Sequence, residues 1–241
     1  MIFALDVGGD AGEALKWVDL LKDHVGMFKI GKEAFTSFGP QLVREVVTRG
    51  GDVFLDLKFH DIPNTVARAA EGALRLNVSM FNIHALGGAR MMEDTVKAVE
   101  VLSRQLGRPM PMILAVTVLT SLDDGDVERL GFHVSASELA VHLARLARDA
   151  GMTGVVASAR EVGPIRDACG DDFVIVTPGI RLAAPAEGDD QKRVLTPREA
   201  LRMGADYIVV GRPIRMADDP VAAARMISEE IAEGIALKTP S

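Results

Sequence analysis

The chain has 241 residues, of which 48% are hydrophobic and 25% are charged, and its formal net charge at pH 7 is −7. An acidic chain without a dense run of Lys and Arg does not suit a phosphate backbone, so we exclude nucleic acid as a partner. Cys169 is the only cysteine, which excludes an internal disulfide and a cysteine-based zinc site.

The N-terminal end and the length of the chain limit its location and its domain organisation. Asp6 brings an acidic side chain too early for a signal peptide, and no apolar stretch approaches the ~20 residues of a membrane span. We therefore expect a soluble, cytoplasmic protein that does not bind a membrane. The length suits a single domain with a large core, and we predict one domain over residues 1–241.

In chain order, the sequence repeats a unit of a short apolar run, a turn and an amphipathic helix. The predicted strands are 2–5, 27–30, 53–57, 80–83, 112–116, 154–157, 173–176 and 207–210. The predicted helices include 12–24, 33–49, 65–76, 89–106, 137–150 and 220–233. This alternation indicates a parallel sheet. Eight such units favour a closed (β/α)8 TIM barrel over a doubly wound open sheet, which usually has about five to seven strands.

Polar residues end most of the predicted strands, where barrels of this class carry their chemistry. They are Asp6, Lys29, Asp56, Lys58, Thr117, Thr120, Arg181 and Arg212. A single charged strand end is usually a solvated cap. Cations and anions at most of the ends indicate instead that the side chains converge on one mouth of the barrel.

The densest group of charges is the run Asp-Leu-Lys-Phe-His-Asp at residues 56–61. In a strand, Asp56 and Lys58 share one face and Leu57 points to the other. Asp61 lies just beyond the strand, so it either folds back toward Lys58 or reaches a neighbouring subunit. Carboxylates this close to one ammonium are typical of a catalytic site. The alternative is a structural ion pair, with Asp61 as a helix N-cap.

The last two strand ends are typical of a phosphate site. In barrels, the loops after strands seven and eight present backbone N–H groups to an anion, and Gly179 and Gly211 permit its close approach. Arg212 can add a charge-assisted hydrogen bond. The alternative is that Gly211 only turns the chain and that Arg212 pairs with Asp218 or Asp219.

The connection between Arg181 and Thr196 is long and has no clear periodicity. Loops of this length are often lids, so we expect this one to close over a ligand. Gln191 would then hydrogen-bond a bound phosphate and the ring beside it. The alternative is an ordinary disordered loop.

Together these residues resemble one family, orotidine 5'-phosphate decarboxylase, over nearly the whole chain. The similarity is carried by Ala4-Leu5-Asp6, Phe28-Lys29-Ile30-Gly31, Asp56-Leu57-Lys58-Phe59-His60-Asp61-Ile62-Pro63-Asn64-Thr65, Val118-Leu119-Thr120-Ser121, Thr177-Pro178-Gly179-Ile180-Arg181, Asp190-Gln191 and Val209-Val210-Gly211-Arg212-Pro213-Ile214. The long motif of the third strand is the most specific of these, since related phosphosugar enzymes share a bare Asp-x-Lys-x-x-Asp.

The resemblance implies decarboxylation of orotidine 5'-phosphate to UMP and CO₂, the last step of de novo pyrimidine synthesis. It implies a homodimer that needs no cofactor and no metal. By the same resemblance, Lys58 protonates the C6 carbanion between Asp56 and Asp61, and Asp61 and Thr65 enter the partner's active site. The implied substrate-binding residues are Asp6, Lys29, Asp56, Lys58, Asp61, Ile62, Thr65, Thr120, Arg181, Gln191, Gly211 and Arg212.

Specific roles follow for part of this set. Asp6 and Lys29 are expected to contact the ribose hydroxyls, and Thr120 the edge of the pyrimidine. Arg181, Gln191, Gly211 and Arg212 are expected on the phosphate side. We assign no catalytic role to the histidines near the strand ends, because an isolated histidine there is more often a hydrogen-bonded neighbour.

Three other functions remain open. A phosphosugar decarboxylase or aldolase-type barrel of the same superfamily would use the cluster to hold Mg²⁺ and an enediolate. A Schiff-base aldolase would use Lys58 as a nucleophile, although two adjacent acids should keep this amine protonated. A non-catalytic phosphometabolite-binding protein would keep Gly211 and Arg212 but would not need the charges around Lys58.

Overall fold

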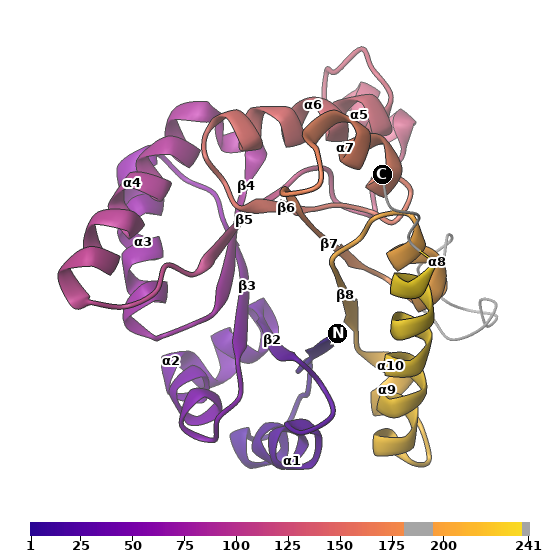
Figure 1. Ribbon diagram of the computed structural model, residues 1–241. Helices are drawn as coiled ribbons and strands as arrows, with labels where there is room; N and C mark the ends of the chain where they lie inside the picture. Colours follow the sequence, from indigo (N-terminus) through magenta and orange to yellow (C-terminus); the bar gives the residue numbers. More distant parts are fainter. Residues whose placement is uncertain (181–194, 238–241) are drawn as a thin grey trace.

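The computed structural model describes residues 1–180 and 195–237. Within these residues, parallel strands close into a barrel in chain order, with β8 beside β1 (Figure 1). The strands are β1 (Ile2–Ala4), β2 (Met27–Gly31), β3 (Val53–Phe59), β4 (Met80–His84), β5 (Met112–Val116), β6 (Gly154–Val156), β7 (Val174–Pro178) and β8 (Tyr207–Val210). The (β/α)8 barrel predicted from the sequence is confirmed.

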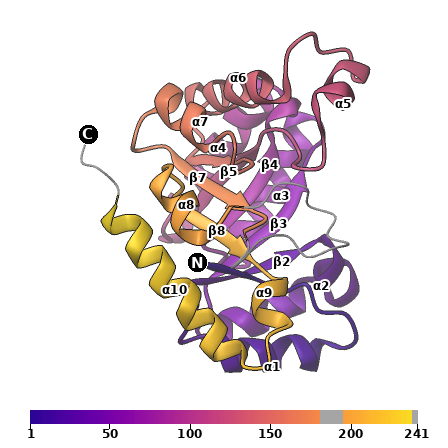
Figure 2. The same ribbon diagram turned by 90° about the vertical axis from the view of Figure 1, so that its right-hand side faces the viewer.

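Helices surround the barrel on its outside (Figure 1). The predicted helices are present as α1 (Ala11–Leu21), α2 (Lys32–Thr48), α3 (Pro63–Arg75), α4 (Ala89–Leu106), α6 (Ala136–Asp149) and α10 (Pro220–Ala236). Shorter elements that the sequence analysis did not predict are η1 (Ala85–Gly87), α5 (Asp124–Arg129), α7 (Val162–Cys169), α8 (Pro197–Arg202) and α9 (Arg212–Arg215). The last three helices lie together beside β8 (Figure 2).

The apolar core has two parts, because each strand presents alternate residues to opposite faces. The larger part fills the space between the strands and the helices and includes Phe3, Ile30 and Leu55. The smaller part fills the interior of the barrel with Ile2, Ala4, Met27, Phe54, Met80, Leu114, Val176 and Val209. Packed side chains therefore fill the barrel, and polar groups have room only at its ends.

No helix in the described ranges 1–180 and 195–237 is long and apolar enough to cross a membrane.

Candidate active site

A polar layer lies next to the apolar interior of the barrel, on the side of the carboxyl ends of the strands. On three neighbouring strands, a polar side chain follows an interior residue by two positions and so points to the same face. The pairs are Met27 and Lys29 on β2, Phe54 and Asp56 on β3, and Met80 and Asn82 on β4. Because the apolar layer excludes water from below, Lys29, Asp56 and Asn82 are buried.

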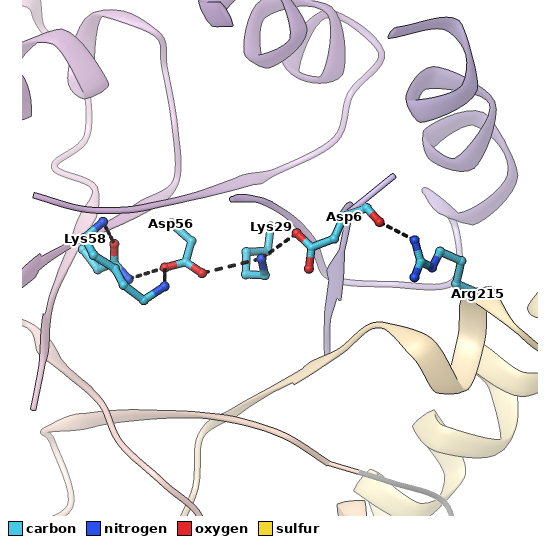
Figure 3. Close-up of polar contacts among 6 residues, drawn as sticks. Asp6, Lys29, Asp56, Lys58 and Arg215 are labelled. Carbon is cyan, nitrogen blue, oxygen red and sulfur yellow. Dashed lines mark hydrogen bonds and ion pairs between the residues drawn. The ribbon is translucent and has the colours of Figure 1, made fainter. Parts of the chain in front are cut away.

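Lys29 joins the carboxylates of two strand ends. Its Nζ lies 3.0 Å from Asp6 Oδ1 and 3.5 Å from Asp56 Oδ2 (Figure 3). Only 11% of the Lys29 side chain is exposed. Burial of an ammonium is costly unless carboxylates compensate its charge, which Asp6 and Asp56 do here. The structure thus brings together three of the residues that the sequence predicted.

Lys58 extends this chain of charges. Its Nζ donates a hydrogen bond to Asp56 Oδ1 over 2.5 Å, and the two side chains are 25% and 12% exposed. Asp56 therefore lies between two ammonium groups, Lys58 on one oxygen and Lys29 on the other. Figure 3 shows the continuous line of contacts from Lys58 to Asp6. An ammonium fixed in this way at the barrel mouth is well placed to give a proton to a bound ligand.

Asp61 lies at the rim of the mouth and does not contact Lys58 in this chain. It is exposed, and its Oδ1 accepts a hydrogen bond from the Ile62 N–H over 2.6 Å. Helix α3 begins at Pro63 with Ile62 as its N-cap and without a side-chain cap, so the alternative in which Asp61 caps the helix is wrong. Ile62 is 67% exposed, and Thr65 is exposed as well.

The phosphate side of the predicted site is described in part. Gly179, at the end of β7, has a φ of 82°, which favours glycine. Gly211 is the N-cap of α9, and a Cβ on it would lie 3.2 Å from the Ala4 Cβ, so tight packing against β1 also favours glycine. Arg212 begins α9 directly after it. Thr120 is exposed in the turn after β5. Arg181 and Gln191 lie outside the described residues, as does most of the predicted lid.

Two residues that support the site were not predicted. The side chain of Asn82 bonds both Asp56 and the backbone N–H of Lys58, at 2.7 Å and 2.8 Å. The Arg215 guanidinium donates to the backbone carbonyl of Asp6 and so holds the end of β1 against α9 (Figure 3). A polar residue inside the apolar run 80–83 was the available signal for Asn82. No sequence pattern pointed to Arg215.

Two histidine rings lie beside the charged layer. The centroids of His60 and His84 are 5.2 Å apart. Burial lowers the pKa of His84 to about 4, with further lowering by the charges of His60, Lys32 and Lys58. The His84 imidazole is therefore neutral near pH 7.

Among the residues that the structure describes, no three His, Cys, Asp or Glu side chains are grouped as ligands for a metal ion. At the mouth, the ammonium of Lys29 occupies the space between the carboxylates of Asp6 and Asp56. The positive charge that balances these two acids is thus supplied by the chain itself.

The fold and this layer define a class of protein: a (β/α)8 barrel whose mouth carries a lysine held between carboxylates. A family model described as "Orotidine 5'-phosphate decarboxylase / HUMPS family" matches residues 1–227. The chain belongs to this family. With the close relatives described next, membership identifies it as an enzyme of the carboxy-lyase class.

Close relatives and a solved structure agree with this assignment. The chain is 61% identical over 238 residues to an orotidine 5'-phosphate decarboxylase of Syntrophus aciditrophicus, covering 99% of this chain and 95% of the relative. It is 56% identical over 234 residues to that of Pelobacter propionicus, covering 97% and 95%. A crystal structure of the decarboxylase of Lactobacillus acidophilus is 36% identical, with a TM-score of 0.83, and the match covers 96% of this chain and 98% of that chain.

Proposed function

We propose that the protein converts orotidine 5'-phosphate to UMP and CO₂, the last step of pyrimidine nucleotide synthesis, without a cofactor. The observation that carries this proposal is the Lys58 ammonium, fixed by Asp56 at the mouth of a barrel of this family. Because the substrate and the product are free nucleotides, we place the enzyme in the cytoplasm. We also propose that residues 1–241 form one barrel domain.

The chemistry explains why an ammonium is needed. When the bond between C6 and the carboxylate breaks, its electron pair stays on C6 in the plane of the ring, where the π system cannot delocalise it. A fixed positive charge close to C6 stabilises this carbanion most as the charge develops. Lys58 then transfers a proton from Nζ to C6, and CO₂ leaves. The neutral amine regains its proton from solvent before the next cycle.

The Asp56 carboxylate holds the Lys58 side chain in place. Asp56 fixes the ammonium through a 2.5 Å hydrogen bond, while Lys29 compensates the second oxygen of Asp56. In this proposal the paired lysine acts as an acid and not as a Schiff-base nucleophile. In the proposed complex, Asp61 of the partner subunit lies on the other side of Lys58.

The proposed homodimer accounts for the exposure of the β3 to α3 connection. Asp61, Ile62 and Thr65 all lie at its surface, and the apolar residue Ile62 is 67% exposed. A second copy of the chain would cover Ile62 and would receive Asp61 and Thr65 at its own mouth. Each site would then be completed by its neighbour.

The remaining predicted residues bind parts of the substrate that do not react. Asp6 and Lys29 bind the ribose hydroxyls, and Thr120 binds the pyrimidine edge. Gly211 and Arg212, together with Arg181 and Gln191, bind the phosphate. Binding of the distant phosphate supplies free energy that positions C6 against Lys58.

The runner-up is a Mg²⁺-dependent phosphosugar decarboxylase or aldolase of the same superfamily. A direct test measures the loss of CO₂ and the formation of UMP from orotidine 5'-phosphate by the purified protein, with and without EDTA. We expect equal rates in both. A strict requirement for Mg²⁺, or turnover of a sugar phosphate in place of the nucleotide, would support the runner-up.

A further inference from the structure

Asn82 occupies an unusual place in the sheet, opposite an irregular part of β3. Leu55 pairs with Phe81 and Phe59 pairs with Ile83, so β3 advances four residues while β4 advances two. The extra residues on β3 interrupt the regular ladder of backbone hydrogen bonds, as in a β-bulge. They include both Asp56 and Lys58, and Asn82 is the single residue of β4 that faces this interruption.

The backbone of Lys58 is strained within the interruption. Its φ is 52°, a left-handed conformation that residues with a side chain rarely adopt. The N–H of Lys58 has no ladder partner on β4, and it donates instead to Asn82 Oδ1 over 2.8 Å. The side chain of Asn82 thus replaces the missing backbone acceptor and helps to hold this conformation.

The amide nitrogen of the same side chain binds the Asp56 carboxylate. Asn82 Nδ2 donates to Asp56 Oδ1 over 2.7 Å, and this oxygen also accepts the 2.5 Å hydrogen bond from Lys58 Nζ. The orientation of the amide follows from its partners, since a carboxylate can only accept and a backbone N–H can only donate. Asn82 is fully buried, so water cannot replace either bond.

We infer that Asn82 is a positioning residue for the proton donor: its amide fixes the Lys58 backbone and the Asp56 carboxylate together. This inference rests on the proposed function. It assigns the geometry of Lys58 to a contact from a neighbouring strand, because neither end of the pair is fixed by β3 alone. A displacement of about 1 Å at a reacting group can cost about 100-fold in rate, which sets the size of the expected effect.

Two variants separate positioning from stability. Asn82→Leu has a similar volume and removes both hydrogen bonds. Asn82→Asp keeps the acceptor for the Lys58 N–H but places a second carboxylate against Asp56 in place of the donor. The matched control is Ile83→Val, the next residue of β4, which is equally buried but belongs to the outer core. Thermal unfolding of each variant shows whether the barrel folds.

The inference predicts a split between kcat and KM. In Asn82→Leu, kcat for CO₂ release falls about 100-fold, while KM changes less than about 3-fold, because the phosphate and ribose contacts remain. In Asn82→Asp, activity is low at pH 8 and rises as the pH falls, since a protonated carboxyl at position 82 can again donate to Asp56. Ile83→Val keeps the kcat and the pH profile of the wild type.

Three other outcomes would contradict either the inference or the proposed function. Wild-type kcat and pH profile in both Asn82 variants would overturn the inference while leaving the proposed function intact. Failure of both variants to fold would also overturn it, because it would assign Asn82 to the stability of the barrel. Lack of activity in the wild type would instead contradict the proposed function.

Discussion

Lys58 Nζ lies 2.5 Å from Asp56 Oδ1, and these two residues of β3 are held by contacts from both neighbouring strands, β2 and β4. Lys29 on β2 lies 3.5 Å from the second oxygen of Asp56, and Asn82 on β4 donates to the first. The carboxylate is therefore fixed independently of Lys58. Removal of the lysine ammonium leaves Asp56 with one cation and one amide donor, so the barrel should tolerate this change.

Arg212 is predicted to anchor the phosphate. Arg212→Ala removes a charge-assisted hydrogen bond worth about 1.5 to 3 kcal/mol, so we expect KM for orotidine 5'-phosphate to rise about 10- to 100-fold. Steady-state kinetics measure this change. The control is Arg202→Ala, on the exposed end of α8, which should keep the wild-type KM. A loss of kcat at unchanged KM would contradict simple anchoring of the phosphate.

The proposed exchange of Asp61 between subunits can be tested by complementation. Lys58→Ala and Asp61→Ala variants should each be inactive alone, because each lacks one member of every site. When the two are mixed and allowed to exchange subunits, half of the dimers are mixed, and one of their two sites has both residues. We therefore expect activity to recover to about a quarter of the wild-type value.

The same mixture distinguishes the two positions of Asp61. If Asp61 acts on Lys58 of its own chain, no mixed dimer contains a complete site and no activity returns. Mixing Lys58→Ala with Lys58→Ala under the same conditions controls for residual activity. Sedimentation of the wild type measures whether a dimer forms.

His84 should make the protein less stable as the pH falls. The pKa of His84 is about 4 in the fold, below its ordinary value of 6.5, so the unfolded chain binds more protons between these values. The contribution is fully present above pH 6.5 and is lost as the pH falls toward 4. Because His84 is only partly buried, we expect a loss of about 1 kcal/mol in the free energy of unfolding by pH 5.

Urea unfolding at pH 7.5 and pH 5 measures this loss in the free energy of unfolding. His84→Gln cannot titrate, so its free energy of unfolding should fall by about 1 kcal/mol less than that of the wild type over the same interval. Equal losses in the two proteins would show that other groups account for the acid sensitivity.

The strands and the long helices could be predicted because their apolar periodicity extends over many residues. The strand 112–116 and the helix 89–106 have the predicted bounds. The helices α5, α8 and α9 are too short for a period to be recognised. A capping pair marks the start of α5 and of α8, such as Thr196 with Glu199 in α8, whereas α9 has no side-chain cap.

The candidate site was predicted only as far as strand ends and alternation allow. Those rules brought Asp6, Lys29 and Asp56 to one mouth. They did not predict the left-handed backbone of Lys58 or the register shift of β3, because both depend on the neighbouring strand. The proposed role of Asp61 involves a second chain, which no pattern within one chain can place.

The central claim is that the Lys58 ammonium performs the chemistry. The most direct measurement is the release of CO₂ from orotidine 5'-phosphate, with EDTA present, by the wild type, Lys58→Ala and the surface control Lys97→Ala. We predict that Lys58→Ala unfolds at nearly the wild-type temperature but loses turnover by about 10⁴-fold or more, while Lys97→Ala stays active. Near-normal turnover by a folded Lys58→Ala protein would contradict the account.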